Sequence, residues 1–125
     1  MAIKKILIAD DEPDVLEILA KKLTQKGYEV RAVGLGKAVI DTAKTFHPDL
    51  LIQDILMTDF DGYTIAQSLR SDKALPSFPI IFMTGKDLQY DGIAKKVAGF
   101  DRCDFVLKPC TFEELLRKIE EVAAR

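Results

Sequence analysis

The sequence contains few of the residues that mark several common classes of protein. It has two cysteines and one histidine, which is too few for a disulfide framework, and the cysteines lack the spacing of a zinc site. The net charge is −2 without runs of Lys or Arg, whereas binding to nucleic acid or anionic membranes needs clustered positive charge. No apolar stretch reaches the roughly 18 residues of a membrane span, and no signal-peptide pattern opens the chain. These absences predict a cytoplasmic protein that binds neither nucleic acid nor membrane.

The length and composition are typical of one domain. The chain has 125 residues, of which 48% are apolar and 30% are charged, as in an ordinary globular protein. A domain of this size buries roughly two-thirds of its extended-chain surface, which is enough for one hydrophobic core without disulfide bonds or structural metal ions. Linkers, repeats and low-complexity segments are absent, so residues 1–125 are predicted to form a single domain.

Short apolar runs alternate with amphipathic stretches along the chain. The apolar runs predict strands over residues 5–9, 28–33, 50–53, 79–83 and 104–107. The amphipathic stretches predict helices from Pro13 to the glycine at 27, over 37–46, about 63–71 and 87–98, and from 111 onward. Thr111 followed by Glu114 is a capping box, a typical helix start. This alternation predicts a doubly wound α/β protein whose parallel sheet is covered on both faces.

Polar side chains stand where the predicted strands end. Asp10 and Asp11 follow the first strand, Asp54 the third, Thr84 the fourth and Lys108 the fifth. If these strands are neighbours, the residues converge at the carboxyl edge of the sheet, where ligands bind in such folds. Two carboxylates ~4 Å apart repel by about 1 kcal/mol in water and about 4 kcal/mol at a partly buried site. We therefore expect a divalent cation beside Lys108, and ligands that are all oxygen favour Mg²⁺ or Mn²⁺ over zinc.

Asp54 is the acid best placed to react. Asp49 enters the third strand and so lies at the opposite edge, while Asp59 and Asp61 are interpreted as turn residues before Gly62. A carboxylate beside a metal can attack phosphorus and form an aspartyl phosphate. Lys108 and the cation would neutralise the phosphoryl oxygens, and the Thr84 hydroxyl would donate a hydrogen bond to one of them.

With these residues at its strand ends, the chain resembles a known family, the response-regulator receiver domains of two-component signalling. It is similar to the single-domain chemotaxis regulators. The resemblance covers essentially the whole chain. Each matching motif is weak alone, but together they occur in the right order at the strand ends. The motifs are Ile8-Ala9-Asp10-Asp11-Glu12, Pro48 to Asp54, Met57, Asp61-Gly62, Met83-Thr84-Gly85 and Lys108-Pro109.

The resemblance implies a flavodoxin-like fold with strand order 2-1-3-4-5 and assigns roles at the site. It implies that Asp54 is the phosphoacceptor and a Mg²⁺ ligand, together with Asp11 and the backbone carbonyl of Leu56. Asp10 would act through a bound water, and Lys108 would pair with the phosphoryl group. The bond before Pro109 would be cis, which is accessible at X-Pro bonds.

The resemblance also implies a switch and partners. Thr84 would move toward the phosphoryl group, and Phe105 would follow as an aromatic switch. The phosphoryl group would come from a sensor histidine kinase or a histidine phosphotransfer protein of a phosphorelay, and a downstream protein effector would read the altered surface. The chain is expected to end after its last helix, as a free-standing regulator or as a fragment of a larger regulator or hybrid kinase.

The sequence departs from the family pattern at several positions near the site. Thr58 replaces a common proline, which predicts a looser turn after Asp54. Leu56 places an apolar side chain beside the site, and we hypothesise that it slows attack of water on the phosphoaspartate. Gln53 stands where an apolar residue is common, and Cys110 replaces a common phenylalanine.

Two other functions compete with a phosphoacceptor that has no catalysis beyond self-phosphorylation and autodephosphorylation. One is a Mg²⁺-dependent phosphatase with an aspartyl-phosphate intermediate. Such enzymes usually need a second acid near the nucleophile, yet Leu56 stands two residues after Asp54 and no cap insertion exists. The other is a receiver-like adaptor that is never phosphorylated, which would predict the loss of an acid or of the lysine.

Overall fold

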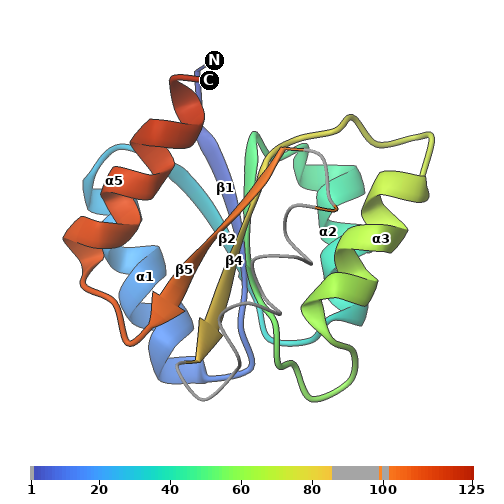
Figure 1. Ribbon diagram of the computed structural model, residues 1–125, viewed down its shortest axis with the longest axis horizontal. Helices are drawn as coiled ribbons and strands as arrows, with labels where there is room; N and C mark the ends of the chain where they lie inside the picture. Colours follow the sequence, from blue (N-terminus) through green and yellow to red (C-terminus); the bar gives the residue numbers. More distant parts are fainter. Residues whose placement is uncertain (1, 86–98, 100–101) are drawn as a thin grey trace.

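A five-stranded parallel sheet forms the centre of the protein, and helices lie on both of its faces (Figure 1). The structure is a computed structural model that describes residues 2–85, 99 and 102–125. The strands are β1 (Lys5–Ala9), β2 (Glu29–Val33), β3 (Leu50–Asp54), β4 (Ile80–Gly85) and β5 (Cys103–Lys108), in the spatial order β2-β1-β3-β4-β5. The helices given in the described residues are α1 (Pro13–Gln25), α2 (Lys37–Phe46), α3 (Gly62–Ser71) and α5 (Phe112–Ala123).

The predicted fold class and strand order are confirmed. β1 and α2 have the predicted bounds, and the other elements differ by a few residues. β2 begins one residue late, because the Tyr28 N–H still donates to the Leu23 carbonyl after α1. β4 and β5 pair as far as Gly85 opposite Lys108 and are therefore longer than the apolar runs. The helix predicted over 87–98 lies outside the described residues.

Two apolar cores fill the space between the sheet and its helices. Alternate residues of a strand point to opposite faces, so Leu51 packs on the side of α2 and α3, while Leu50 and Ile52 pack on the side of α1 and α5. All three side chains are fully buried. Burial of each such side chain contributes roughly 1.5–3 kcal/mol. The continuous apolar runs in the sequence therefore reflect a sheet that is covered on both faces.

Local hydrogen bonds set where the later helices begin. The Asp61 carboxylate accepts from the Thr64 backbone N–H at 2.9 Å before α3. The Thr111 hydroxyl accepts from the Glu114 backbone N–H at 3.1 Å before α5, which confirms the start predicted there. These side chains satisfy N–H groups that have no partner within a first helical turn.

The carboxyl ends of all five strands lie at one edge, away from the two chain termini (Figure 1). Asp49 lies at the opposite edge as predicted, where its carboxylate accepts from the backbone N–H groups of Lys4 and Lys5. Within the described residues, none of the helices is both long and apolar enough to cross a membrane. The described residues at the carboxyl ends of β1, β3, β4 and β5 thus share one edge.

Candidate functional site

The Lys108 ammonium joins two buried acids at the carboxyl edge of the sheet. Its Nζ lies 2.7 Å from Asp10 Oδ2 and 3.5 Å from Asp54 Oδ1. Asp10 is fully buried directly after β1, and Asp54 is 5% exposed at the end of β3. The other oxygen of Asp10 accepts from the Glu12 backbone N–H at 2.9 Å. Residues 98 positions apart in the sequence therefore meet, as their places at strand ends predict.

The single ammonium does not cancel the negative charge around it. Burial first, and then the negative charges of Asp10 and Asp11, together raise the pKa of Asp54 from 3.8 to about 6, against the opposing effect of Lys108. Burial alone would lower the pKa of Lys108, but its hydrogen bond to Asp10 and the neighbouring carboxylates outweigh this effect and raise it. The cluster thus has the charge imbalance that a bound cation would relieve.

Asp10, Asp11 and Glu12 bring carboxylate oxygens within 4.8 Å of one another. The exposed Glu12 carboxylate also lies 3.8 Å from Lys108 Nζ. Glu12 was not among the predicted ligands, although the run of three acids after β1 was a signal for it. A donor set made only of oxygen atoms fits a hard cation such as Mg²⁺.

The remaining predicted ligands lie on or after β3. Asp54 shares Lys108 with Asp10, so it belongs to the same cluster. Leu56 lies two residues beyond β3 in an isolated antiparallel bridge with Asp61, and its side chain is 55% exposed. The structure therefore brings Asp10, Asp11 and Asp54 to one edge and places Leu56 in the loop that follows Asp54.

Thr84 has a buried hydroxyl beside this cluster. Met83 is the register partner of Asp54 on the adjacent strand, so Thr84 lies one residue nearer the carboxyl edge. Its side chain is 1% exposed, and Oγ1 has no hydrogen-bond partner among the described residues. Because an unpaired buried hydroxyl costs about 1–3 kcal/mol, this group is poised to donate to an incoming acceptor.

Phe105 lies on β5, the strand that pairs with the strand of Thr84, two register positions before Thr84. It is opposite Phe82 in the sheet register and packs against the core on the α2 and α3 side. The side chain is half-buried in the structure. Phe105 is therefore part of the packing against this core, on the strand next to that of Thr84.

The backbone of Asp54 is held closely by its neighbours. The fully buried Gln53 side chain donates from Nε2 to the Asp54 carbonyl at 2.9 Å. The Gly62 N–H donates to the Ile55 carbonyl at 2.7 Å. A Cβ atom at Gly62 would lie only 2.6 Å from the Asp54 carbonyl oxygen. The glycine in the Asp-Gly motif therefore allows α3 to approach the end of β3.

The loop between β3 and α3 is held at two points, in place of the looser turn expected from Thr58. The Thr58 hydroxyl donates to Asp11 Oδ2 at 2.9 Å. The Asp59 carboxylate accepts from the backbone N–H groups of Gly36 and Lys37, at 2.8 and 3.0 Å, where α2 begins. These backbone hydrogen bonds lower the pKa of the exposed Asp59 carboxyl, and the one from Lys37 has the largest effect. Asp59 was predicted to be a turn residue, and it also caps another helix.

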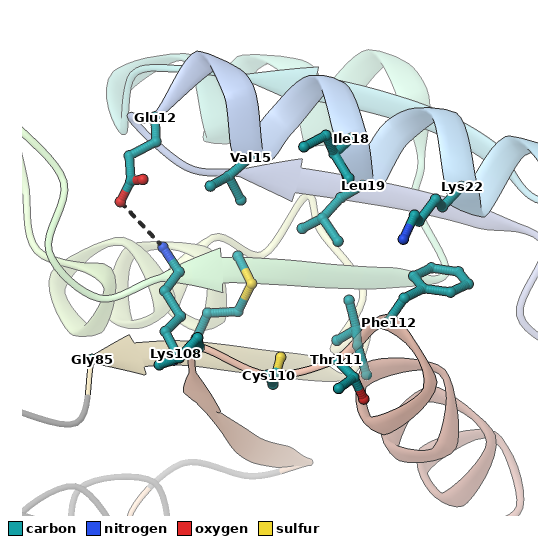
Figure 2. A pocket seen from close by; sticks show the side chains of 13 residues that line it. Glu12, Val15, Ile18, Leu19, Lys22, Gly85, Lys108, Cys110, Thr111 and Phe112 are labelled. Atoms are coloured by element: carbon teal, nitrogen blue, oxygen red, sulfur yellow. Dashed lines mark ion pairs between the residues drawn. The ribbon is translucent and has the colours of Figure 1, made fainter.

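An apolar groove of about 680 Å³ begins beside the acid cluster and runs between α1 and the start of α5 (Figure 2). Glu12 and Lys108 stand at one end, and Lys22 lies near the Phe112 ring at the other. Ile18 of α1 lines the groove and is 54% exposed. Cys110, which replaces the larger phenylalanine common in the family, also lines it, and burial raises the pKa of its thiol.

Comparisons with known proteins match nearly the whole chain to one family. Residues 6–120 match the family model described as response regulator receiver domain. The chain is 32% identical over 120 residues to the probable transcriptional regulatory protein TcrX of Mycobacterium tuberculosis, covering 96% of this chain and 50% of that protein. It is 31% identical over 122 residues to the alkaline phosphatase synthesis transcriptional regulatory protein PhoP of Bacillus subtilis, covering 98% and 49%. The chain thus spans about half the length of the curated relatives it matches.

Solved structures share the fold. A putative response regulator from Chloroflexus aurantiacus superimposes with a TM-score of 0.85 at 31% identity, covering 99% of this chain and 100% of that one. The chemotaxis response regulator CheY4 of Vibrio cholerae superimposes with a TM-score of 0.86 at 21% identity, covering 97% and 99%. The second likeness concerns the fold alone.

Proposed function

Because this chain belongs to the response regulator receiver domain family, whose members are phosphoacceptor signalling modules, we propose that Asp54 is its phosphoacceptor. A carboxylate oxygen of Asp54 would attack the phosphorus of a phosphohistidine on a partner protein. A P–O bond forms, the P–N bond breaks, and the electron pair of that bond stays on the imidazole nitrogen. The observation that supports this assignment most directly is the Lys108 ammonium, which lies within 4 Å of both Asp10 and Asp54.

The residues around Asp54 fit a Mg²⁺ site. We assign direct contacts to Asp11, Asp54 and the backbone carbonyl of Leu56, and a contact through water to Asp10. The support comes from the carboxylate oxygens that Asp10, Asp11 and Glu12 bring close together, and from the raised pKa of Asp54, which burial and the charges of Asp10 and Asp11 cause. When bound, Mg²⁺ supplies positive charge that offsets the charge on the transferring phosphoryl group.

Two side chains of the protein would hold the phosphoryl oxygens after transfer. Lys108 already lies close to Asp54 and would pair with one oxygen. Thr84 would donate its unpaired hydroxyl to another, which would remove the cost of leaving that group unsatisfied. Movement of Thr84 toward the phosphoryl group would free space for Phe105, and this shift would alter the surface that a partner reads.

The partners follow from this role. We propose that a sensor histidine kinase or histidine phosphotransfer protein supplies the phosphoryl group and that a downstream protein effector reads the switched state. We further propose that residues 1–125 act as a single receiver domain in the cytoplasm, without binding nucleic acid or membrane. Its own catalysis would be limited to self-phosphorylation and autodephosphorylation.

A hydrolase that acts through an aspartyl-phosphate intermediate is not favoured. The curated relatives are regulatory proteins. In addition, the exposed side chain two residues after Asp54 is the apolar Leu56, which cannot serve as an acid or a base.

The assignment is tested by incubation with acetyl phosphate and Mg²⁺, followed by intact mass spectrometry. We expect the wild type to gain one phosphoryl group, and we expect no gain in Asp54→Asn or after chelation of Mg²⁺ with EDTA. Asp41→Asn, on the exposed surface of α2, is the matched control and should be modified like the wild type. Modification of Asp54→Asn to the same extent would refute the assignment.

A further inference from the structure

We propose that Thr58 is a positioning residue that orients the Asp11 carboxylate for Mg²⁺. This inference rests on the proposed function, since it concerns a ligand of the same site. Thr58 is also the position at which the sequence departs from the proline common in the family. The structure gives this departure a specific contact with the acid cluster.

The contact joins two loops that are distant in the sequence. Thr58 Oγ1 lies 2.9 Å from Asp11 Oδ2, across a separation of 47 residues. Asp11 belongs to the segment after β1, and Thr58 belongs to the loop after β3. A hydrogen bond to a charged acceptor is stronger than one between neutral groups. Because the hydroxyl engages one oxygen of the carboxylate, the other remains available to a cation.

The position of Thr58 is fixed by its two sequence neighbours rather than by Asp11. On one side, the Met57 side chain is only 9% exposed and packs into the core beside α2 and α3. On the other side, the Asp59 carboxylate is bound to the N–H groups of Gly36 and Lys37. The hydroxyl is therefore presented from a loop that is anchored at both flanking residues, as a positioning group requires.

Each of the three aspartates in the cluster faces a donor side chain. Asp10 is held by the Lys108 ammonium and the Glu12 backbone N–H. Asp54 shares the Lys108 ammonium. For Asp11, the side-chain donor that the structure shows among the described residues is the Thr58 hydroxyl. Without that donor, repulsion from the other carboxylates would turn Asp11 toward solvent, and metal binding would have to restore its orientation.

The test is the affinity of the protein for Mg²⁺, measured by isothermal titration calorimetry on four proteins. Thr58→Val keeps the shape of the side chain and removes the hydroxyl, and Thr58→Ser keeps the hydroxyl. Thr45→Val removes an exposed hydroxyl that, in the part of the chain that the structure describes, donates to carbonyls of its own helix, and it serves as the control. We expect Thr58→Val to raise the Kd for Mg²⁺ by about threefold to tenfold. Thr58→Ser and Thr45→Val should remain within about twofold of the wild type.

The outcomes separate this inference from the proposed function. Affinity of Thr58→Val equal to or higher than that of the wild type, with Asp54 still phosphorylated, would overturn the inference alone. Failure of the wild type to bind Mg²⁺ would contradict both. Thermal unfolding in EDTA checks that each variant folds, and Thr58→Ala takes the place of Thr58→Val if the valine variant does not. At saturating Mg²⁺ every Thr58 variant should still gain one phosphoryl group from acetyl phosphate.

Discussion

The substitution Asp54→Asn should stabilise the protein when Mg²⁺ is absent. Asp54 is 5% exposed and lies near two other aspartates, and its pKa is raised from 3.8 to about 6. Near neutral pH, ionisation of Asp54 therefore costs more free energy in the folded protein than in the unfolded chain. Asparagine has the same shape without the charge, so it removes this cost and leaves the hydrogen bond between Lys108 and Asp10 in place.

The size and pH dependence of the effect follow from the change in pKa. A rise of about two pKa units corresponds to about 3 kcal/mol of unfolding free energy at about pH 8, where the carboxylate is ionised in both states. A folded pKa above the unfolded one means that the wild type loses stability as the pH rises from about 4 to about 6. The advantage of Asp54→Asn should therefore be near its full value at about pH 8, roughly half at about pH 5 and small near pH 4.

The assay is urea unfolding followed by far-ultraviolet circular dichroism in EDTA, at about pH 8 and about pH 5. Asp41→Asn, an exposed aspartate on α2, controls for the general effect of removing one negative charge. Saturating Mg²⁺ should reduce or reverse the difference in unfolding free energy between Asp54→Asn and the wild type. An ion that binds the folded state stabilises it by mass action, and the wild type binds Mg²⁺ better.

One result would refute the electrostatic account of the site. If Asp54→Asn is no more stable than the wild type in EDTA at about pH 8, the crowding of acids does not dominate the energetics. An advantage that grows as the pH falls would have the wrong sign for a raised pKa and would point instead to a packing effect.

Three further substitutions test other parts of the site. Lys108→Met should lower the unfolding free energy in EDTA by about 2–3 kcal/mol, because the buried Asp10 loses its charged donor; unchanged urea midpoints would contradict this. Gly62→Ala should cost about 1–3 kcal/mol in the same assay, since the new Cβ would meet the Asp54 carbonyl at 2.6 Å, and a neutral result would show that the loop adapts freely. Leu56→Asn should shorten the lifetime of the phosphoryl group in a mass-spectrometric time course, because an exposed polar side chain admits water; equal lifetimes would discard the hypothesis.

The sequence predicted the parts of the site that depend on topology. Strands of a parallel sheet end at one edge, so Asp10, Asp54 and Lys108 could be brought together without knowing any loop. The apolar runs that predict the strands are strong signals because both faces of the sheet are covered. The structure bears out these positions with distances of 2.7 and 3.5 Å from Lys108 to the two acids.

The sequence could not predict contacts that depend on loop conformation. The hydrogen bond from Thr58 to Asp11 and the capping of α2 by Asp59 join segments that follow different strands. Loop residues lack the hydrophobic periodicity that marks helices and strands, so the partners of Thr58 and Asp59 could not be inferred from sequence spacing. The groove beside Cys110 depends in a similar way on how the segment after β5 turns into α5. Glu12 is an intermediate case, because its place in a run of acids was visible while its distance to Lys108 was not.

Charge balance offers a physical reason why this arrangement can switch. Asp10, Asp11, Glu12 and Asp54 against one lysine leave three negative charges in excess, and one Mg²⁺ would neutralise two of them. Transfer of a phosphoryl group would replace the single charge of Asp54 with a group of about −1.5 to −2 at neutral pH, so about 0.5 to 1 further negative charge would be added at a new position. Lys108 lies close enough to respond, and Thr84 has a buried hydroxyl without a partner among the described residues. Such a site would hold its resting arrangement until phosphorylation shifts the charge, and the first groups to move would be Thr84 and Lys108, at the carboxyl ends of β4 and β5.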